Sequence, residues 1–327
     1  MGAVTRLTER VARWGASAAS ATAGGRLLVL TYHRVLPVRD ELIPEIPDVP
    51  TFTWQMRLLA EQFRPLPLAE ATARLAAGTL PRRAVSVTFD DGYLDNATVA
   101  YPILRAHRVP ATLFVATGYL DGGRMFNDTV IETVRRLPGG GYDATWLGLG
   151  TLPLEGLAAR RHAFEAIIGA IKYRSPAARD EAVARLAADA ASPLPDDLMM
   201  TRAGVKALDG DLVAIGAHTR RHPILAETDA KAAEAEIADG RDDLVGLLNR
   251  PVPLFAYPNG RPGRDYRPEH VEMVRRAGFA TAVSTAWGAA SRRSRPLEVP
   301  RIAGLGAGSA EFALRLARNY LAEEPAR

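Results

Sequence analysis

The stretch AVSVTFDDGYLDN, residues 84–96, decides how the rest of the chain is interpreted. It begins as an apolar, β-branched run that predicts a buried strand, and it ends in two adjacent carboxylates, Asp90 and Asp91, followed by Gly92. Successive side chains of a strand point to opposite faces, so the two acids should face different partners. The pattern therefore predicts two separate roles for two neighbouring carboxylates.

Strand-like runs alternate with helical patterns along most of the chain, which is typical of parallel pairing. About seven such units predict an α/β fold, a distorted (β/α)7-type barrel, in which the carboxyl ends of the strands carry the chemistry. His33, Asp90, Asp91, His218 and Asn259 all fall at such ends. The expected strands are residues 26–33, 84–89, 111–117, 211–219, 252–258, 280–286 and 297–302.

Between the third and fourth expected strands the pattern changes. Residues 118–200 show no strong strand and are rich in Ala and Arg at helical spacing, which predicts a helical insertion at about 125–200. We expect an N-terminal helical extension over 1–25, a main domain over 26–305 that carries this insertion, and a C-terminal helix within 306–327.

The composition narrows the possible chemistry. The chain has 327 residues, of which 47% are hydrophobic and 24% charged, as in ordinary globular proteins. The net charge of +4 is spread along the chain and does not form the concentrated basic patch that nucleic-acid binding needs. Because there are no cysteines, disulfides, thiol nucleophiles and Cys-based zinc sites are excluded, so a metal site must use His, Asp and Glu.

The N-terminal segment lacks the continuous apolar core of a signal peptide, and no stretch approaches the roughly 18 apolar residues of a membrane span. We therefore expect a cytoplasmic protein. Apolar residues at helical spacing leave two alternatives for this segment, a helix packed on the domain or an interfacial helix at the inner membrane face. These apolar residues are Val4, Leu7, Val11 and Trp14. The sequence does not indicate an oligomeric state.

The stretch GAHTRRHP, residues 216–223, carries His218 and His222. In a helix or a tight turn, side chains four positions apart share a face, so both imidazoles can hold one ion. The alternative is a pair of loop histidines bonded to the backbone. Two imidazoles and one carboxylate make a three-ligand set with room for water, which is typical of catalytic zinc sites. The other carboxylate would then be free to take a proton from that water.

Three motifs in this order, TFDDGYLDN, HTRRHP and FAYPNG, resemble the polysaccharide deacetylases, the NodB-homology family of carbohydrate esterases. The resemblance covers roughly residues 26–305. The stretch LTYHRVLP is similar to the branch of exopolysaccharide and poly-N-acetylglucosamine deacetylases. The resemblance implies a distorted β/α barrel, an acetylated glycan as substrate, and a divalent metal, commonly Zn²⁺, with Co²⁺, Ni²⁺ or Mn²⁺ as alternatives.

Carried over residue by residue, the resemblance implies that Asp90 is the general base and that Asp91, His218 and His222 bind the metal. The backbone N–H of Asn259 falls where the family donates a hydrogen bond to the oxyanion, a role that needs only a backbone donor. The alternative for the YPNG stretch is an ordinary Asn-Gly turn.

The sequence departs from the family pattern in two places. Many members have an arginine shortly before the position of Pro258, where this chain is apolar and aromatic. Arg301 is expected to supply that charge, with a surface arginine as the alternative.

The second departure is the family's late histidine, the usual general acid, because no histidine follows His270. His33 is the expected replacement, because the first and last strands of a closed barrel are neighbours. Bonding to the backbone alone, or service as a fourth metal ligand, are the alternatives for His33.

The resulting hypothesis is a metal-dependent deacetylase that hydrolyses acetyl groups on N-acetylated sugars of a polysaccharide or its precursor, within exopolysaccharide biosynthesis. One alternative is O-deacetylation of an acetylated glycan. Another is a non-catalytic glycan-binding or assembly protein with a degenerate site.

Overall fold

The computed structural model describes residues 25–304 and 309–321. The expected N-terminal extension over 1–25 therefore lies almost wholly outside the described residues, and so does its membrane alternative. The expected C-terminal helix is α11 (Ser309–Leu321). No helix of the described ranges has both the length and the apolar character that a membrane crossing requires.

Parallel strands form the centre of the molecule, as the alternating pattern predicts. The sheet order is β10-β1-β3-β4-β7-β8-β9, and the short β2 (Arg64–Pro65) pairs with the start of β3. Each pairing in this sheet is parallel. The strands are β1 (Leu27–Tyr32), β3 (Ala84–Phe89), β4 (Ala111–Val115), β7 (Val213–Ala217), β8 (Leu254–Ala256), β9 (Thr281–Val283) and β10 (Ile302–Ala303).

The two ends of the sheet meet through the segment that leads into β10. Val283 of β9 forms a parallel bridge with Val299, and the N–H of Ser284 donates to the Val299 carbonyl at 2.8 Å. The same segment continues into β10, which pairs with β1. The sheet therefore curls into the expected distorted barrel, and Arg301 lies in the segment that closes it.

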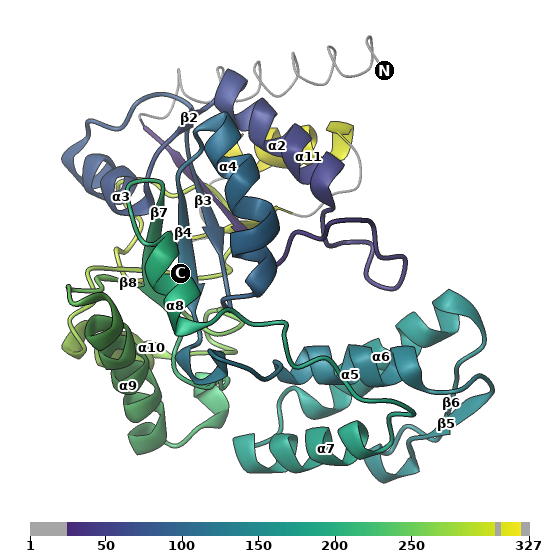
Figure 1. The fold of residues 1–327 in the computed structure, drawn as a ribbon. Coiled ribbons are helices and arrows are strands. Elements are labelled where there is room, and N and C mark those ends of the chain that lie inside the picture. The colour runs from purple at the N-terminus through teal and green to yellow at the C-terminus, as the bar shows by residue number, and fades with distance from the viewer. Residues whose placement is uncertain (1–24, 305–308, 322–327) are drawn as a thin grey trace.

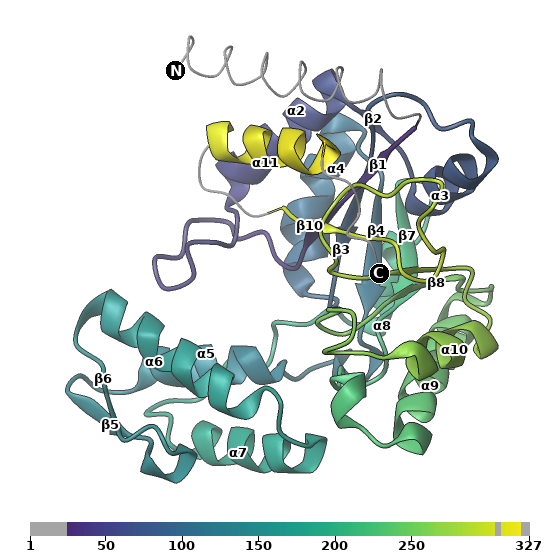
Figure 2. The same cartoon turned by 180° about the vertical axis from the view of Figure 1, so that it is seen from behind.

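Helices cover the outside of the curled sheet. Figures 1 and 2 show α2, α4 and α11 together on one side, with α9 and α10 at the opposite end of the sheet. The helices of the barrel are α2 (Val49–Gln62), α3 (Leu68–Ala77), α4 (Tyr101–His107), α8 (Arg202–Leu208), α9 (Ala230–Leu248), α10 (Pro268–Arg276) and α11, with a π-helical turn η1 (Asn96–Ala100) before α4.

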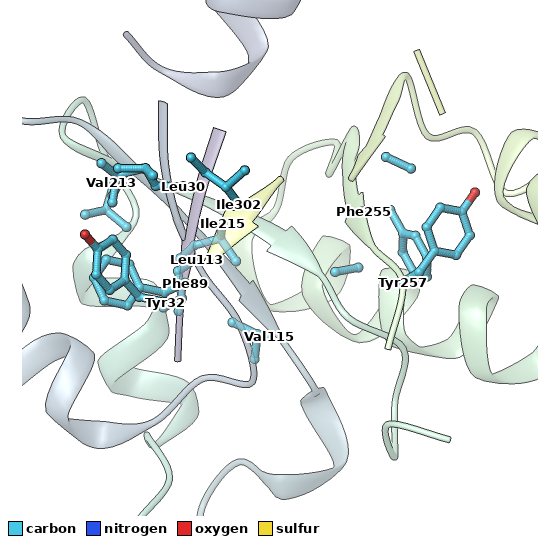
Figure 3. Close-up of a cluster of buried hydrophobic side chains, with 14 of the residues drawn as sticks. Leu30, Tyr32, Phe89, Leu113, Val115, Val213, Ile215, Phe255, Tyr257 and Ile302 are labelled. Carbon is cyan, nitrogen blue, oxygen red and sulfur yellow. The ribbon is translucent and has the colours of Figure 1, made fainter. Parts of the chain in front are cut away.

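Alternation along the strands separates two faces. Leu30, Phe89 and Ile215 belong to the large cluster that packs under the helices, and this cluster is drawn in Figure 3. The residues between them on the same strands face the barrel interior. There Gly216 has no room for a side chain, because a Cβ would lie 2.6 Å from the ring of Phe114. The interior is thus filled at its base, and polar side chains gather above it.

The insertion between β4 and β7 forms a separate lobe, visible below the barrel in Figure 1. It contains α5 (Phe126–Arg136), α6 (Gly156–Ile171) and α7 (Pro176–Ala188), and it has its own apolar cluster that includes Val130, Phe164 and Leu186. The insertion also contains one element that the sequence did not indicate. The short strands β5 (Gly141–Asp143) and β6 (Thr151–Pro153) form an antiparallel hairpin in it.

Candidate active site

Asp90 extends the inward-facing side of β3 and is held by a buried arginine. Arg301, whose side chain has no exposed surface, donates from Nη1 to Oδ1 of Asp90 at 2.7 Å and from Nη2 to Oδ2 at 2.8 Å. The same guanidinium donates to the Thr88 hydroxyl at 3.1 Å and to the Ser284 carbonyl at 3.2 Å. The surface alternative for Arg301 is therefore wrong.

Asp91 leaves the strand in the left-handed region, with φ of 77°. This conformation is costly for a residue with a side chain and is typical of functional sites. Its Oδ1 atom lies 3.5 Å from Nε2 of His218 and 3.5 Å from Nε2 of His222. One donor atom from each of the three residues lies within 4.8 Å of the others, so the structure brings the expected ligand set together.

The two histidines reach Asp91 by different routes. His218 continues the inner face of β7, and its Nδ1 donates to the Ala256 carbonyl at 2.7 Å, which leaves Nε2 free to act as a ligand. His222 follows a tight turn rather than a helix, since Thr219 and His222 have φ of 61° and 54°. The N–H of His222 donates to the Thr219 hydroxyl at 3.1 Å, which fixes this turn.

The turn is supported by a residue that sequence reasoning missed. Glu236 of α9 is 7% exposed and accepts hydrogen bonds from the backbone N–H groups of Arg220 and Arg221 at 3.0 and 2.7 Å. Gly240, one turn further along α9, allows this approach, because a Cβ there would lie 2.6 Å from the backbone of Thr219. The sequence signal that could have indicated this support is the spacing of Glu236 and Gly240, which lie four positions apart and therefore on one face of α9.

The donor set fits a cation. Asp91 Oδ1 is buried and has no hydrogen-bond partner among the described residues. Donors about 2.1 Å from one tetrahedral ion lie roughly 3.4 Å apart, close to the separations found here. Burial and the charges of Asp90 and Asp128 raise the pKa of Asp91 well above its ordinary value. Burial lowers the pKa of His218 to about 4 and that of His222 well below its ordinary value, so both imidazoles are neutral, as ligands must be.

The remaining candidates lie at the same rim. His33 follows β1 and is exposed, and no described side chain bonds its ring. Desolvation by the surrounding protein lowers the pKa of His33, against the opposing charge of Asp90. Asn259 has φ of 57°, and no described residue accepts a hydrogen bond from its backbone N–H. His270, by contrast, accepts from the Arg267 N–H at 2.9 Å and caps α10.

Comparison with known proteins indicates a family. The model of the polysaccharide deacetylase family matches residues 77–147 and 192–282, two segments on either side of the central part of the insertion. Across these two segments the chain is similar to the polysaccharide deacetylase family. The proteins of this family are hydrolases that remove acetyl groups from sugars. The Bacillus subtilis (strain 168) protein YxkH, named for the same family, is 32% identical over 92 residues. The matched residues are 28% of this chain and cover 32% of the length of that relative.

Solved structures agree on the fold. The chain is similar to the Streptococcus pyogenes deacetylase PplD in complex with acetate, with a TM-score of 0.61 and 21% identity over 90% of this chain and 99% of that one. It is also similar to IcaB from Ammonifex degensii, with a TM-score of 0.57 and 21% identity over 92% and 99% of the two chains. At this identity the likeness establishes the deacetylase fold and leaves substrate and metal to be inferred.

Proposed function

We propose that the protein is a metal-dependent deacetylase that hydrolyses the N-acetyl group of a sugar in a glycan or glycan precursor. The observation that carries the proposal is the separation of the two adjacent carboxylates. The Asp91 carboxylate lies beside His218 and His222, and its Oδ1 has no hydrogen-bond partner among the described residues. The Asp90 carboxylate is instead bound by Arg301. One acid therefore serves a cation and the other serves proton transfer.

A divalent cation held by Asp91, His218 and His222, with zinc the best match to these donors, would polarise the acetyl carbonyl and make water more acidic. Asp90 takes the proton of the attacking water. Burial acts to raise the pKa of Asp90, but the charge and hydrogen bonds of Arg301 outweigh it and hold the pKa well below its usual range. Asp90 is thus ionised at neutral pH. A carboxylate has about four lone-pair positions, so Arg301 leaves acceptor positions open.

The other roles follow from position. The free N–H of Asn259 is available to the negative charge that develops on the carbonyl oxygen. His33 supplies the proton that the leaving amine needs, because it is the exposed histidine at the rim beside Asp90. Arg301 orients Asp90 and takes the place of the arginine that many members carry before the position of Pro258.

The glycan would approach between the insertion and the rim. The insertion contacts two sides of the site, because Asp128 of α5 accepts from the Tyr93 hydroxyl at 2.9 Å and the Tyr173 hydroxyl donates to Asp265 at 3.0 Å. We propose that this lobe limits access and affects substrate choice. Trp287 follows β9 and is 67% exposed, which suits stacking on a sugar face, whereas Tyr93 is buried.

The decisive experiment is acetate release from a panel of N- and O-acetylated oligosaccharides, with and without chelator. We expect release from N-acetylated substrates that stops on chelation and returns with Zn²⁺. Release confined to O-acetyl esters would favour the O-deacetylase alternative. Binding without release in the metal-loaded protein would favour the non-catalytic alternative and contradict the proposal.

A further inference from the structure

A cavity of about 790 Å³ lies between the insertion and the barrel, on the outer side of the turn that carries His222. Figures 1 and 2 show α7 of the insertion beside α9 of the barrel at this place. Arg221 and Pro223, the neighbours of His222, line one wall, and Arg179 of α7 lines the other. The volume is in the range of pockets that hold small ligands.

Arg179 is a buried cation without adequate partners. Its side chain is 5% exposed, and no described residue accepts a hydrogen bond from its guanidinium, whose Nε is fully buried. The guanidinium lies 4.8 Å from the centre of the Phe126 ring. Its ion pair with Asp180 is long, at 4.0 Å, and the Asp180 side chain is 75% exposed. Buried guanidinium groups normally donate several hydrogen bonds, so these donors lack an acceptor.

Two of the three acids on the cavity wall are paired with other arginines. Glu236 accepts from the Arg221 side chain at 3.0 Å, and Asp239 lies 3.7 Å from Arg220. Arg124, also on the cavity wall, donates to the Pro195 carbonyl at 2.6 Å but has a buried Nε without a partner. The third acid, Asp180, makes only the long contact with Arg179. Guanidinium N–H groups of Arg179 and Arg124 are therefore left without an acceptor among the described residues of the cavity wall.

We propose that this cavity binds an anionic group of the glycan, a carboxylate or a phosphate, with Arg179 as its principal partner. A planar guanidinium donates two parallel hydrogen bonds to either group. The assignment of this anion to the substrate rests on the proposed function. It follows from the wall that the cavity shares with the His222 turn, which places a neighbouring residue of a bound glycan at Arg179.

The test is a calorimetric binding titration, which needs no turnover. The probes are neutral N,N′,N″,N‴-tetraacetylchitotetraose, a tetrasaccharide alternating N-acetylglucosamine and glucuronate, N,N′,N″,N‴-tetraacetylchitotetraose carrying one 6-phosphate, and inorganic phosphate. The proteins are the wild type, Arg179→Met, Arg179→Lys and the control Arg185→Met. Arg185 is on the same helix and also lies over a ring, that of Trp146 at 4.2 Å, but does not line the cavity.

We expect the wild type to bind at least one acidic tetrasaccharide about tenfold or more tighter than the neutral one, the size expected for hydrogen bonds to a charged group. The preference should disappear in Arg179→Met, weaken in Arg179→Lys and persist in Arg185→Met. The Lys variant keeps the charge and carries the test if the Met variant does not fold. The arm with the larger preference identifies carboxylate or phosphate as the bound group.

Equal affinity of the wild type for acidic and neutral glycans would overturn the proposal, and so would a preference unchanged by both Arg179 substitutions. Binding of inorganic phosphate alone, without any preference among glycans, would also overturn it. The two proposals fail separately. Acetate release without a preference for acidic glycans would reject anion binding at Arg179 and support the deacetylase proposal. Binding of acidic glycans that depends on Arg179, without acetate release, would support anion binding and reject the deacetylase proposal.

Discussion

The ion pair between Arg301 and Asp90 gives the sharpest prediction about stability. In the Arg301→Met variant the Asp90 carboxylate stays buried, at 4% exposure, but loses both of its guanidinium contacts. Removing one partner of a buried pair typically costs about 3–5 kcal/mol, because the other charge is left uncompensated. We expect the free energy of unfolding of the metal-free protein at pH 7 to fall by this amount.

The pH dependence has a defined sign. In the wild type the pKa of Asp90 is depressed, so the pair stabilises the fold above the unfolded pKa of Asp, about 3.8, and this contribution is lost as the pH falls through the lower folded pKa. In Arg301→Met the largest influence that opposes burial is gone, and only the weaker effects of His218 and His33 still act to lower the Asp90 pKa. The buried carboxylate therefore destabilises the fold at neutral pH, and this cost disappears when Asp90 is protonated. The difference between the two proteins should therefore shrink as the pH falls towards 4.

The assay is urea denaturation, in chelator, of the wild type, Arg301→Met, Asp90→Asn and the double variant, at pH 7 and pH 5. We expect the double variant to be less destabilised than the sum of the single variants by at least about 2 kcal/mol, within the range of contacting pairs. A loss below about 1 kcal/mol for Arg301→Met, the value of an exposed pair, would refute the reasoning. Additive effects in the cycle would refute it as well.

Three further predictions concern single side chains. Asp90→Asn should keep bound zinc and lose at least ~10²-fold in rate, the lower end of general-base contributions, and a near-normal rate would remove Asp90 from this role. His33→Ala should reduce turnover of an N-acetyl amide far more than that of an activated aryl acetate, whose leaving group needs no proton; equal losses or loss of metal would argue against an acid. Burial raises the pKa of Asp128 from 3.8 to about 6, so its contribution to stability is present below pH 4 and lost as the pH rises through 6. Asp128→Asn should accordingly raise the free energy of unfolding of the metal-free protein at pH 8, by up to about 3 kcal/mol, and change it little at pH 4, whereas a difference independent of pH would contradict the assignment.

The strand ends were predictable because a buried parallel strand has a local sequence pattern, a short apolar run rich in β-branched residues. Apolar β-branched runs that stop at Asp90 and His218 fix both the strand and the rim, and alternation then explains why Asp90 faces the barrel interior while Asp91 does not. The conformation of Asp91 itself, with its positive φ, depends on the turn and was not indicated by residue type.

Residues that act across long sequence separations were harder to predict. Arg301 lies 211 positions from Asp90, and only closure of the barrel decides that it faces inward rather than solvent. Arg179 and Arg185 lie on the same Ala-rich helix and are alike in sequence, so the burial of Arg179 against Phe126 is evident only from the tertiary structure. The hairpin of β5 and β6 was missed because each strand has three residues, too few for a periodic signal.

The central claim, a cation held by Asp91, His218 and His222, is tested most directly by titrating chelator-treated protein with Zn²⁺ in a calorimeter. The account predicts one site per chain in the wild type and in the control His162→Ala, whose side chain is exposed on α6. It predicts loss of that site, or affinity reduced by at least ~10²-fold, in each of Asp91→Ala, His218→Ala and His222→Ala. Each substitution leaves only two protein ligands, fewer than a zinc site normally has. Unchanged zinc stoichiometry and affinity in all three variants would contradict it.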